Sequence, residues 1–111
     1  MSEPELSYQA FLKSKDSTEV TSLIAYWTHD RGRLRAVMWH ASRKEWISAP
    51  SLAAGILFDD AYTDEARSVD RATAETMARV FLHSTLPTSE ELQELAEEGE
   101  RMGWEFGPPR T

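Results

Sequence analysis

Histidine serves most readily as a general base or metal ligand near neutral pH, and the chain contains His29, His40 and His83. Their spacing fits no metal motif, because neither a His-x-His nor a His-x-x-x-His pair occurs. Cysteine is absent from the sequence, which excludes disulfides, thiolate nucleophiles and cysteine-based zinc or iron–sulfur sites. We therefore expect no metal and no cofactor, and we interpret the three histidines as structural.

Two carboxylate pairs, Asp59-Asp60 and Asp64-Glu65, stand in one polar stretch between two expected helices. Paired carboxylates can perform acid/base chemistry, as they do in glycosidases. The stretch lacks the spacing of a calcium loop, and the sequence has no glycine-based phosphate or nucleophile motif. An enzyme that uses Asp59 or Asp60 with His40 is the weakest alternative, and we expect a protein without enzymatic activity.

The charge of the sequence is unevenly distributed. Residues 1–50 hold seven Lys or Arg and six Asp or Glu, a balance of +1, whereas residues 51–111 hold five Arg and thirteen Asp or Glu, a balance of −8. An acidic surface repels phosphate backbones, so we expect no nucleic-acid binding. The acidic first residues, 1–5, lack the basic start and apolar run of a signal peptide. No apolar stretch is long enough to span a bilayer, and we expect a cytoplasmic protein that contacts no membrane.

One group of basic residues stands against this acidic background. Its members are Arg31, Arg33, Arg35, Arg43 and Lys44. Two of them belong to one expected turn and two to the next, and alternate turns of a meander lie at opposite ends of the sheet. We therefore interpret these side chains as serving solubility.

The expected last helix carries six Glu against one Arg, with Glu90, Glu94 and Glu98 repeating every four residues on one face. Such a row is either a solvated face or a surface that steers a basic partner. Together with the acidic stretch and two tryptophans, it supplies our candidate partner-binding residues. They are Asp59, Asp60, Asp64, Glu65, Glu90, Glu94, Glu97, Glu98, Trp39 and Trp46.

The segments from Val20 to Thr28 and from Leu34 to His40 are rich in β-branched and aromatic residues, which predicts a hairpin. With Arg31-Gly32 as its two-residue loop, Trp27 and Trp39 point to opposite faces. Trp46, on a third strand from Glu45 to Ala49, is expected to join Trp39. A sheet face left open around these tryptophans would suit a protein interface or a dimer, and the alternative, that helices cover both faces, is equally favoured.

Helices are expected to pack this sheet. The first segment, Pro4 to Ser14, fits both helical spacing and strand alternation, and its Pro and Glu favour a helix. The other expected helices run from Ser51 to about Phe58, from Arg71 to His83 after the N-cap Asp70, and from a capping box at Thr88 and Glu91 to Met102 before the C-cap Gly103. Residues 59–68 are expected to form a loop. The two expected buried stripes are Ala74, Met77, Ala78 and Phe81 in one helix, and Leu92, Leu95, Ala96, Gly99 and Met102 in the next.

The predicted fold is α+β, a three-stranded antiparallel meander packed by three to four helices. A single globular domain is expected over residues 1–111, with the sheet at about 20–49, the helical part at about 51–103 and a loose tail at 105–111.

Part of the sequence resembles short uncharacterised proteins of actinobacterial type. The residues that carry the resemblance are Trp39, Trp46, Leu52 and Ile56, then the acidic stretch and the run Val69-Asp70-Arg71-Ala72-Thr73-Ala74-Glu75. The resemblance covers about residues 20–83 and implies no activity, cofactor or partner.

These observations together predict a non-enzymatic domain that binds another protein, one with a basic surface, through its acidic second half and its aromatic sheet. The most concrete version is an immunity or antitoxin-like inhibitor, by analogy of charge and size. The alternative is a small accessory or ligand-binding domain that acts as a homodimer.

Overall fold

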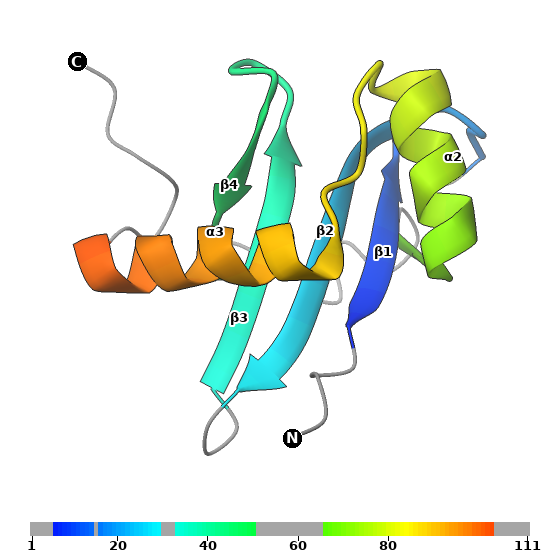
Figure 1. The fold of residues 1–111 in the computed structure, drawn as a ribbon. Helices are drawn as coiled ribbons and strands as arrows, with labels where there is room; N and C mark the ends of the chain where they lie inside the picture. The colour runs from blue at the N-terminus through cyan, green and yellow to red at the C-terminus, as the bar shows by residue number, and fades with distance from the viewer. Residues whose placement is uncertain (1–5, 15, 30–32, 51–65, 104–111) are drawn as a thin grey trace.

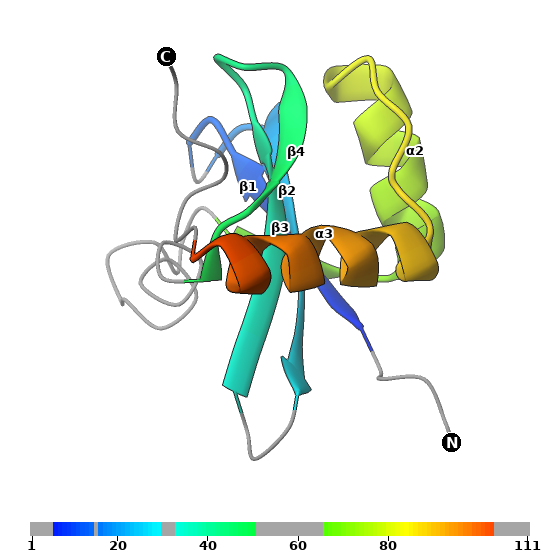
Figure 2. The ribbon, with the colours of Figure 1, turned by 60° about the vertical axis from the view of Figure 1, so that its left-hand side comes forward.

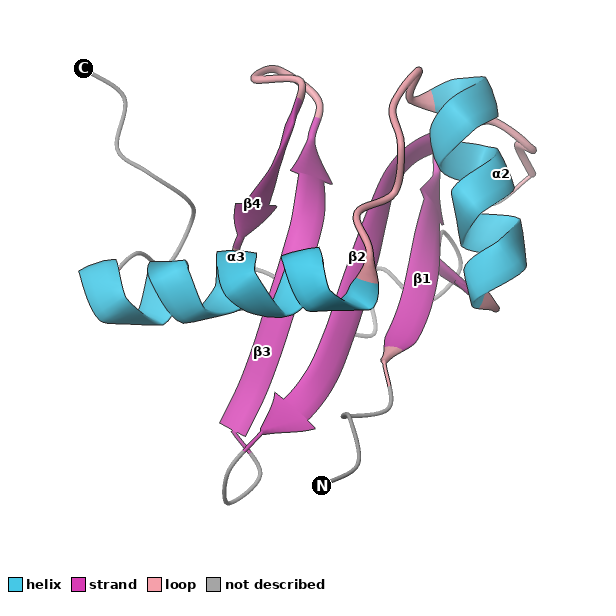
Figure 3. Ribbon diagram, viewed as in Figure 1, coloured by secondary structure: helices cyan, strands magenta, loops and turns pink. Residues whose placement is uncertain are grey.

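The computed structural model describes residues 6–14, 16–29, 33–50 and 66–103. Within them the chain forms five strands and two helices, which confirms the α+β class (Figures 1 and 3). The elements are β1 (Ser7–Leu12), β2 (Val20–His29), β3 (Arg33–His40), β4 (Glu45–Ser48), β5 (Ala66–Val69), α2 (Arg71–Phe81) and α3 (Ser89–Met102). The expected helix from Ser51 to Phe58 and the expected tail at 105–111 lie outside the described residues.

The sheet has five strands in the order β4-β3-β2-β1-β5, and each neighbouring pair is antiparallel. It therefore contains the predicted meander of three strands and two strands more.

The prediction of a helix at the start of the chain is wrong, because β1 occupies this position. Tyr8 and Ala10 alternate with outward residues and are buried, and they pair with Ala25 and Leu23 of β2. The strand is bonded on both edges, to β2 and to β5. Pairing on two sides satisfies its backbone groups, and this outweighs the weak helical preference of the segment.

The prediction of a loop over residues 59–68 is wrong in its last part, because β5 begins at Ala66. Its pairs with β1 run from Tyr8 opposite Val69 to Phe11 opposite Ala66. The strand is short and contains the exposed Arg67 and Ser68 at its centre. Short and polar composition is typical of edge strands, and it leaves little apolar alternation to read from the sequence.

The register between β2 and β3 differs from the predicted one by one residue. His29 lies opposite Arg33 and Ile24 lies opposite Met38, so residues 30–32 stand between the strands in place of a two-residue loop. A slip of one residue moves every side chain of a strand to the other face. Trp27 and Trp39 therefore share one face, and the prediction that they point in opposite directions is wrong.

Both described helices lie on the face that carries Trp27 and Trp39, so the main core forms between this face and the helices (Figures 1 and 2). In Figure 1, α2 runs beside β1 and α3 crosses over β3 and β4. The buried members of the main core are Tyr8, Ala10, Val20, Leu23, Ala25, Trp27, Val37, Trp39, Ala74, Ala78, Leu82, Leu86, Leu92 and Ala96.

The opposite face of the sheet carries a smaller buried cluster. Phe11, Ile24 and Ala36 form its centre. The partly buried side chains of Tyr26, Met38 and Ala66 pack against them.

The two helices begin as predicted. The Asp70 carboxylate accepts the Thr73 N–H at 2.7 Å, and Thr88 and Glu91 form the reciprocal capping box at 3.1 Å in each direction. The end of α2 differs from the prediction. The helix stops at Phe81, two residues before the predicted end, and Leu82 is buried where Phe81 was expected to be.

Two of the expected buried side chains are exposed. Phe81, at the last position of α2, is 38% exposed, and Met102, at the last position of α3, is 57% exposed. Figure 1 shows the end of α3 reaching past β4. The other members of both stripes are buried or partly buried.

Candidate functional site

The structure describes six of the ten sequence-predicted site residues. The other four, Asp59, Asp60, Asp64 and Glu65, lie outside the described residues. The four glutamates belong to α3, and the two tryptophans belong to β3 and β4.

The six glutamates of α3 divide by what they contact. Glu91 caps the helix through its bond to the Thr88 N–H. Glu97 and Glu100 reach Arg35 of β3. The remaining three, Glu90, Glu94 and Glu98, are exposed, and within the described part of the chain they pair with no cation; we refer to them as the acidic ridge.

Arg35 holds α3 against the sheet. Its side chain is only 11% exposed, its guanidinium forms an ion pair with Glu100, and its Nη1 lies 3.9 Å from the Glu97 carboxylate. Among the described residues its Nε has no hydrogen-bond partner, and neither has the indole N–H of Trp27, directly opposite on β2. Arg35 is therefore an internal anchor, and Glu97 has an intramolecular partner as well as an exposed carboxylate.

The tryptophans do not form an open interface. Trp39 is 8% exposed and packs edge to face on Trp46, with ring centroids 5.4 Å apart. The indole N–H of Trp46 donates to the Ser84 hydroxyl at 3.2 Å, which ties β4 to the segment after α2. The predicted contact between Trp39 and Trp46 is confirmed. Trp39 is buried and Trp46 is half-buried against the main core, so the two rings do not form an open aromatic face, and their role in binding a partner stays a prediction.

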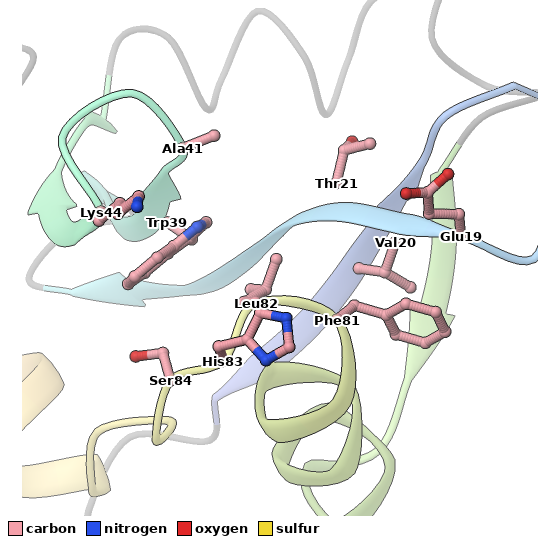
Figure 4. A pocket seen from close by; sticks show the side chains of 10 residues that line it. All are labelled: Glu19, Val20, Thr21, Trp39, Ala41, Lys44, Phe81, Leu82, His83 and Ser84. Atoms are coloured by element: carbon pink, nitrogen blue, oxygen red, sulfur yellow. The ribbon is translucent and has the colours of Figure 1, made fainter.

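A groove of about 650 Å³ opens between the end of α2 and the sheet (Figure 4). Three separate segments line it: the start of β2, the end of β3 with the turn that follows, and the end of α2. Its lining residues are Glu19, Val20, Thr21, Trp39, Ala41, Lys44, Phe81, Leu82, His83 and Ser84. Sequence reasoning missed this groove, because no motif joins the three segments.

Two lining residues of the groove have an unusual backbone conformation. Lys44 has φ 55° and His83 has φ 52°, and within the described chain they are the only residues other than glycine with positive φ. The left-handed conformation costs roughly 1 kcal/mol for a residue with a Cβ. Nearby bonds hold both turns: the Lys44 N–H donates to the His40 carbonyl at 2.7 Å, and the Ser84 N–H donates to the Ala78 carbonyl at 3.0 Å.

The groove has different charges at its two ends. Figure 4 shows Lys44 beside Trp39 at one end, Glu19 and Phe81 at the other, and His83 between them. The Glu19 carboxylate lies 3.9 Å from the Lys13 ammonium. Lys44 and His83 form no side-chain hydrogen bond or ion pair among the described residues. Among the described residues, Lys44 is therefore a cationic group of the groove without an ion-pair partner, and Glu19 supplies a carboxylate at the opposite end.

The described residues provide no metal centre and no membrane span. Over these residues, no three His, Asp or Glu side chains gather closely enough to hold a metal ion. His40 accepts the Arg43 N–H at its Nδ1, at 3.1 Å, while His83 lies in the groove. Neither described helix is long and apolar enough to cross a membrane.

The comparisons with known proteins identify no family for this chain. It matches no protein-family model, no curated protein and no solved structure. The resemblance to short actinobacterial proteins stays a prediction, and function is argued from the residues of this chain.

Proposed function

We propose that this domain is a non-enzymatic protein-binding module whose acidic ridge contacts a basic surface on another protein. The observation that supports this proposal is the exposure of Glu90, Glu94 and Glu98 on a helix that is anchored on its other side. Leu92 and Ala96 are buried against the sheet, and Arg35 pairs with Glu97 and Glu100. The ridge is therefore presented outward on a fixed support.

The ridge has an energetic disadvantage that a partner would remove. Like charges four residues apart on a helix destabilise it by a few tenths of a kcal/mol per pair. A basic surface facing the ridge would turn this repulsion into attraction and would accelerate association through electrostatic steering. Nucleic acid is not expected as a partner, because its phosphates are negatively charged like the glutamates of the ridge.

The most concrete form of this function is an immunity or antitoxin-like inhibitor. Proteins of this kind cover a basic substrate-binding cleft, and a domain with a net charge of −7 is suited to such a cleft. A homodimer built symmetrically on the acidic ridge is disfavoured, since a two-fold axis would bring the same glutamates face to face. The inhibitor therefore remains the better interpretation of this surface.

The test is a quantitative capture of partners from native lysate by a variant with Glu90→Lys, Glu94→Lys and Glu98→Lys. We expect basic partners recovered by the wild-type protein to be lost from this variant. For each purified partner, the association rate with the wild-type protein should fall steeply as salt is raised past physiological strength.

A matched control separates the effect of the ridge on binding from the effect of net charge. The control carries three reversals at exposed carboxylates elsewhere, Asp16→Lys, Glu45→Lys and Glu75→Lys, so that its net charge equals that of the ridge variant. Both variants should keep a cooperative melting transition. Equal recovery of the same partners by the wild-type protein and the ridge variant would reject the proposal, and equal loss in both variants would reject the ridge as its location.

A further inference from the structure

The groove at the end of α2 has the size and walls of a small-molecule site. Its volume of about 650 Å³ falls within the range of roughly 300–1,000 Å³ that is usual for ligand pockets. Its floor consists of the buried side chains of Val20, Trp39 and Leu82, and Phe81 forms an exposed wall. Aromatic side chains at two positions favour a ligand with a flat apolar body, because rings pack well by offset or edge-to-face contacts.

The end of the groove that holds Lys44 favours an anionic group. Lys44 has no ion-pair partner among the described residues, whereas Glu19, at the other end, lies near Lys13. This local positive charge stands out in a chain whose net charge is −7. The imidazole of His83, which lies between the two ends of the groove, adds a hydrogen-bond donor, since one ring nitrogen carries a proton even in the neutral form.

The backbone at these two residues supports a role for their side chains. Glycine is the usual residue where a helix ends in the left-handed conformation, and α3 ends in this way with Gly103 at φ 72°. The end of α2 has His83 in the corresponding conformation, and the turn after β3 has Lys44. Both strained positions line the same groove. Side chains retained at unfavourable backbone positions are a feature of binding sites.

We infer that the groove binds a small aromatic monocarboxylate. The carboxylate pairs with the Lys44 ammonium and accepts a hydrogen bond from the His83 ring, a charge-assisted arrangement that is stronger than a neutral one. The aromatic body lies along the groove against Trp39 and Phe81. This inference is independent of the acidic ridge, which lies on α3 and contributes no residue to the groove.

The experiment uses 1-naphthylacetate as the probe and 1-naphthylacetamide as its neutral counterpart. The two have the same apolar body, so a difference in affinity measures the carboxylate alone. Binding is followed by isothermal titration calorimetry. We expect the acid to bind with a dissociation constant below about 1 mM and the amide to bind at least tenfold more weakly.

Two variants locate the site. Lys44→Gln and His83→Gly should each weaken binding of the acid at least fivefold and should leave the weak binding of the amide nearly unchanged. His83→Gly should keep or raise the melting temperature, since glycine relieves the left-handed backbone, so a loss of binding in this variant cannot be ascribed to unfolding. Arg101→Gln, on the exposed surface of α3, removes one positive charge away from the groove and should leave binding unchanged.

Three results would overturn the inference. They are equal affinity for the acid and the amide, undiminished binding of the acid by Lys44→Gln, and absence of binding of the acid at millimolar concentration. Because none of these measurements involves the acidic ridge, failure here leaves the proposed protein-binding function standing.

Discussion

The two helices use the same backbone conformation at their ends with opposite residue choices. His83 after α2 and Gly103 after α3 both have left-handed φ, 52° and 72° respectively. A Cβ built on Gly103 would meet no atom of the described residues within 4 Å, and the left-handed φ favours glycine there. At the end of α2 the strain is accepted and an imidazole lines the groove. A side chain retained at such a strained position indicates a role for that side chain, and the imidazole of His83 lines the groove.

The helices also differ in how they are attached to the sheet. α2 packs through the small buried residues Ala74 and Ala78, and α3 packs through Leu92 and through the ion pairs of Arg35. Arg71, at the start of α2, donates to the Tyr8 hydroxyl at 2.9 Å and to the Pro87 carbonyl at 2.8 Å. It thus joins β1 to the segment between the helices. The buried residues of α2 are thus two alanines, whereas α3 combines the buried Leu92, Ala96 and Gly99 with the ion pairs of Arg35.

The largest expected effect tests the attachment of α3. Leu92→Ala should lower the free energy of unfolding by about 2–5 kcal/mol, because Leu92 is fully buried and its truncation leaves a cavity. Met102→Ala, on the same helix at an exposed position, should cost less than about 0.5 kcal/mol. Urea unfolding measures both. Similar costs in the two variants would show that α3 is not anchored through its apolar face.

A substitution that gives the end of α3 the same residue type as the end of α2 is expected to have a smaller effect. Gly103→His should cost about 1 kcal/mol, since the position has space for a side chain but a left-handed φ. The measurement is the shift in urea midpoint relative to the wild-type protein. An unchanged midpoint would mean that the left-handed conformation carries no cost at a helix end in this protein, and the strain argument for His83 would lose its support.

The smallest expected effect is a pH dependence of stability that comes from the titratable N-cap Asp70. Hydrogen bonds from the Thr73 side chain and backbone lower the pKa of Asp70 below its ordinary value. The folded state therefore favours the carboxylate, and this contribution is present above the unfolded pKa of about 3.9 and is lost as the pH falls through the lower folded pKa. Asp70→Asn keeps a capping oxygen that does not titrate.

Thermal unfolding at a series of pH values should reveal this difference. Between about pH 5 and about pH 2 the wild-type protein should lose more stability than the Asp70→Asn variant. Parallel curves for the two proteins would contradict a role of the Asp70 charge in holding α2.

Short-range signals in the sequence predicted the two described helices, α2 and α3. The caps at Asp70, Thr88 and Gly103 were found because each depends on residues at most four positions apart. β1 was missed because the spacing of Tyr8 and its neighbours fits a helix as well as a strand. Its pairing with β2 and β5, which decides between the two, involves residues distant in sequence.

The candidate site was less predictable than the fold. One residue of error in the hairpin loop placed Trp39 on the wrong face, and this alone suggested an exposed aromatic surface. The ion pair of Arg35 with Glu100 joins residues 65 positions apart, so the division of the glutamates could not be read from their spacing. The groove combines three distant segments, and the left-handed conformations of Lys44 and His83 have no sequence signature.

The position of β1 inside the sheet has a consequence for the order of folding. The strands β1 to β4 pair with their neighbours in the chain, and Leu12 and Val20 are only 8 positions apart. β5 pairs with β1 across at least 55 positions, from Phe11 to Ala66, and closing this longer loop costs about 2 kcal/mol more in chain entropy. During synthesis β1 is therefore bonded on one side only until residue 69 has been made. The unpaired edge of the nascent sheet then passes from the apolar β1 to the polar β5.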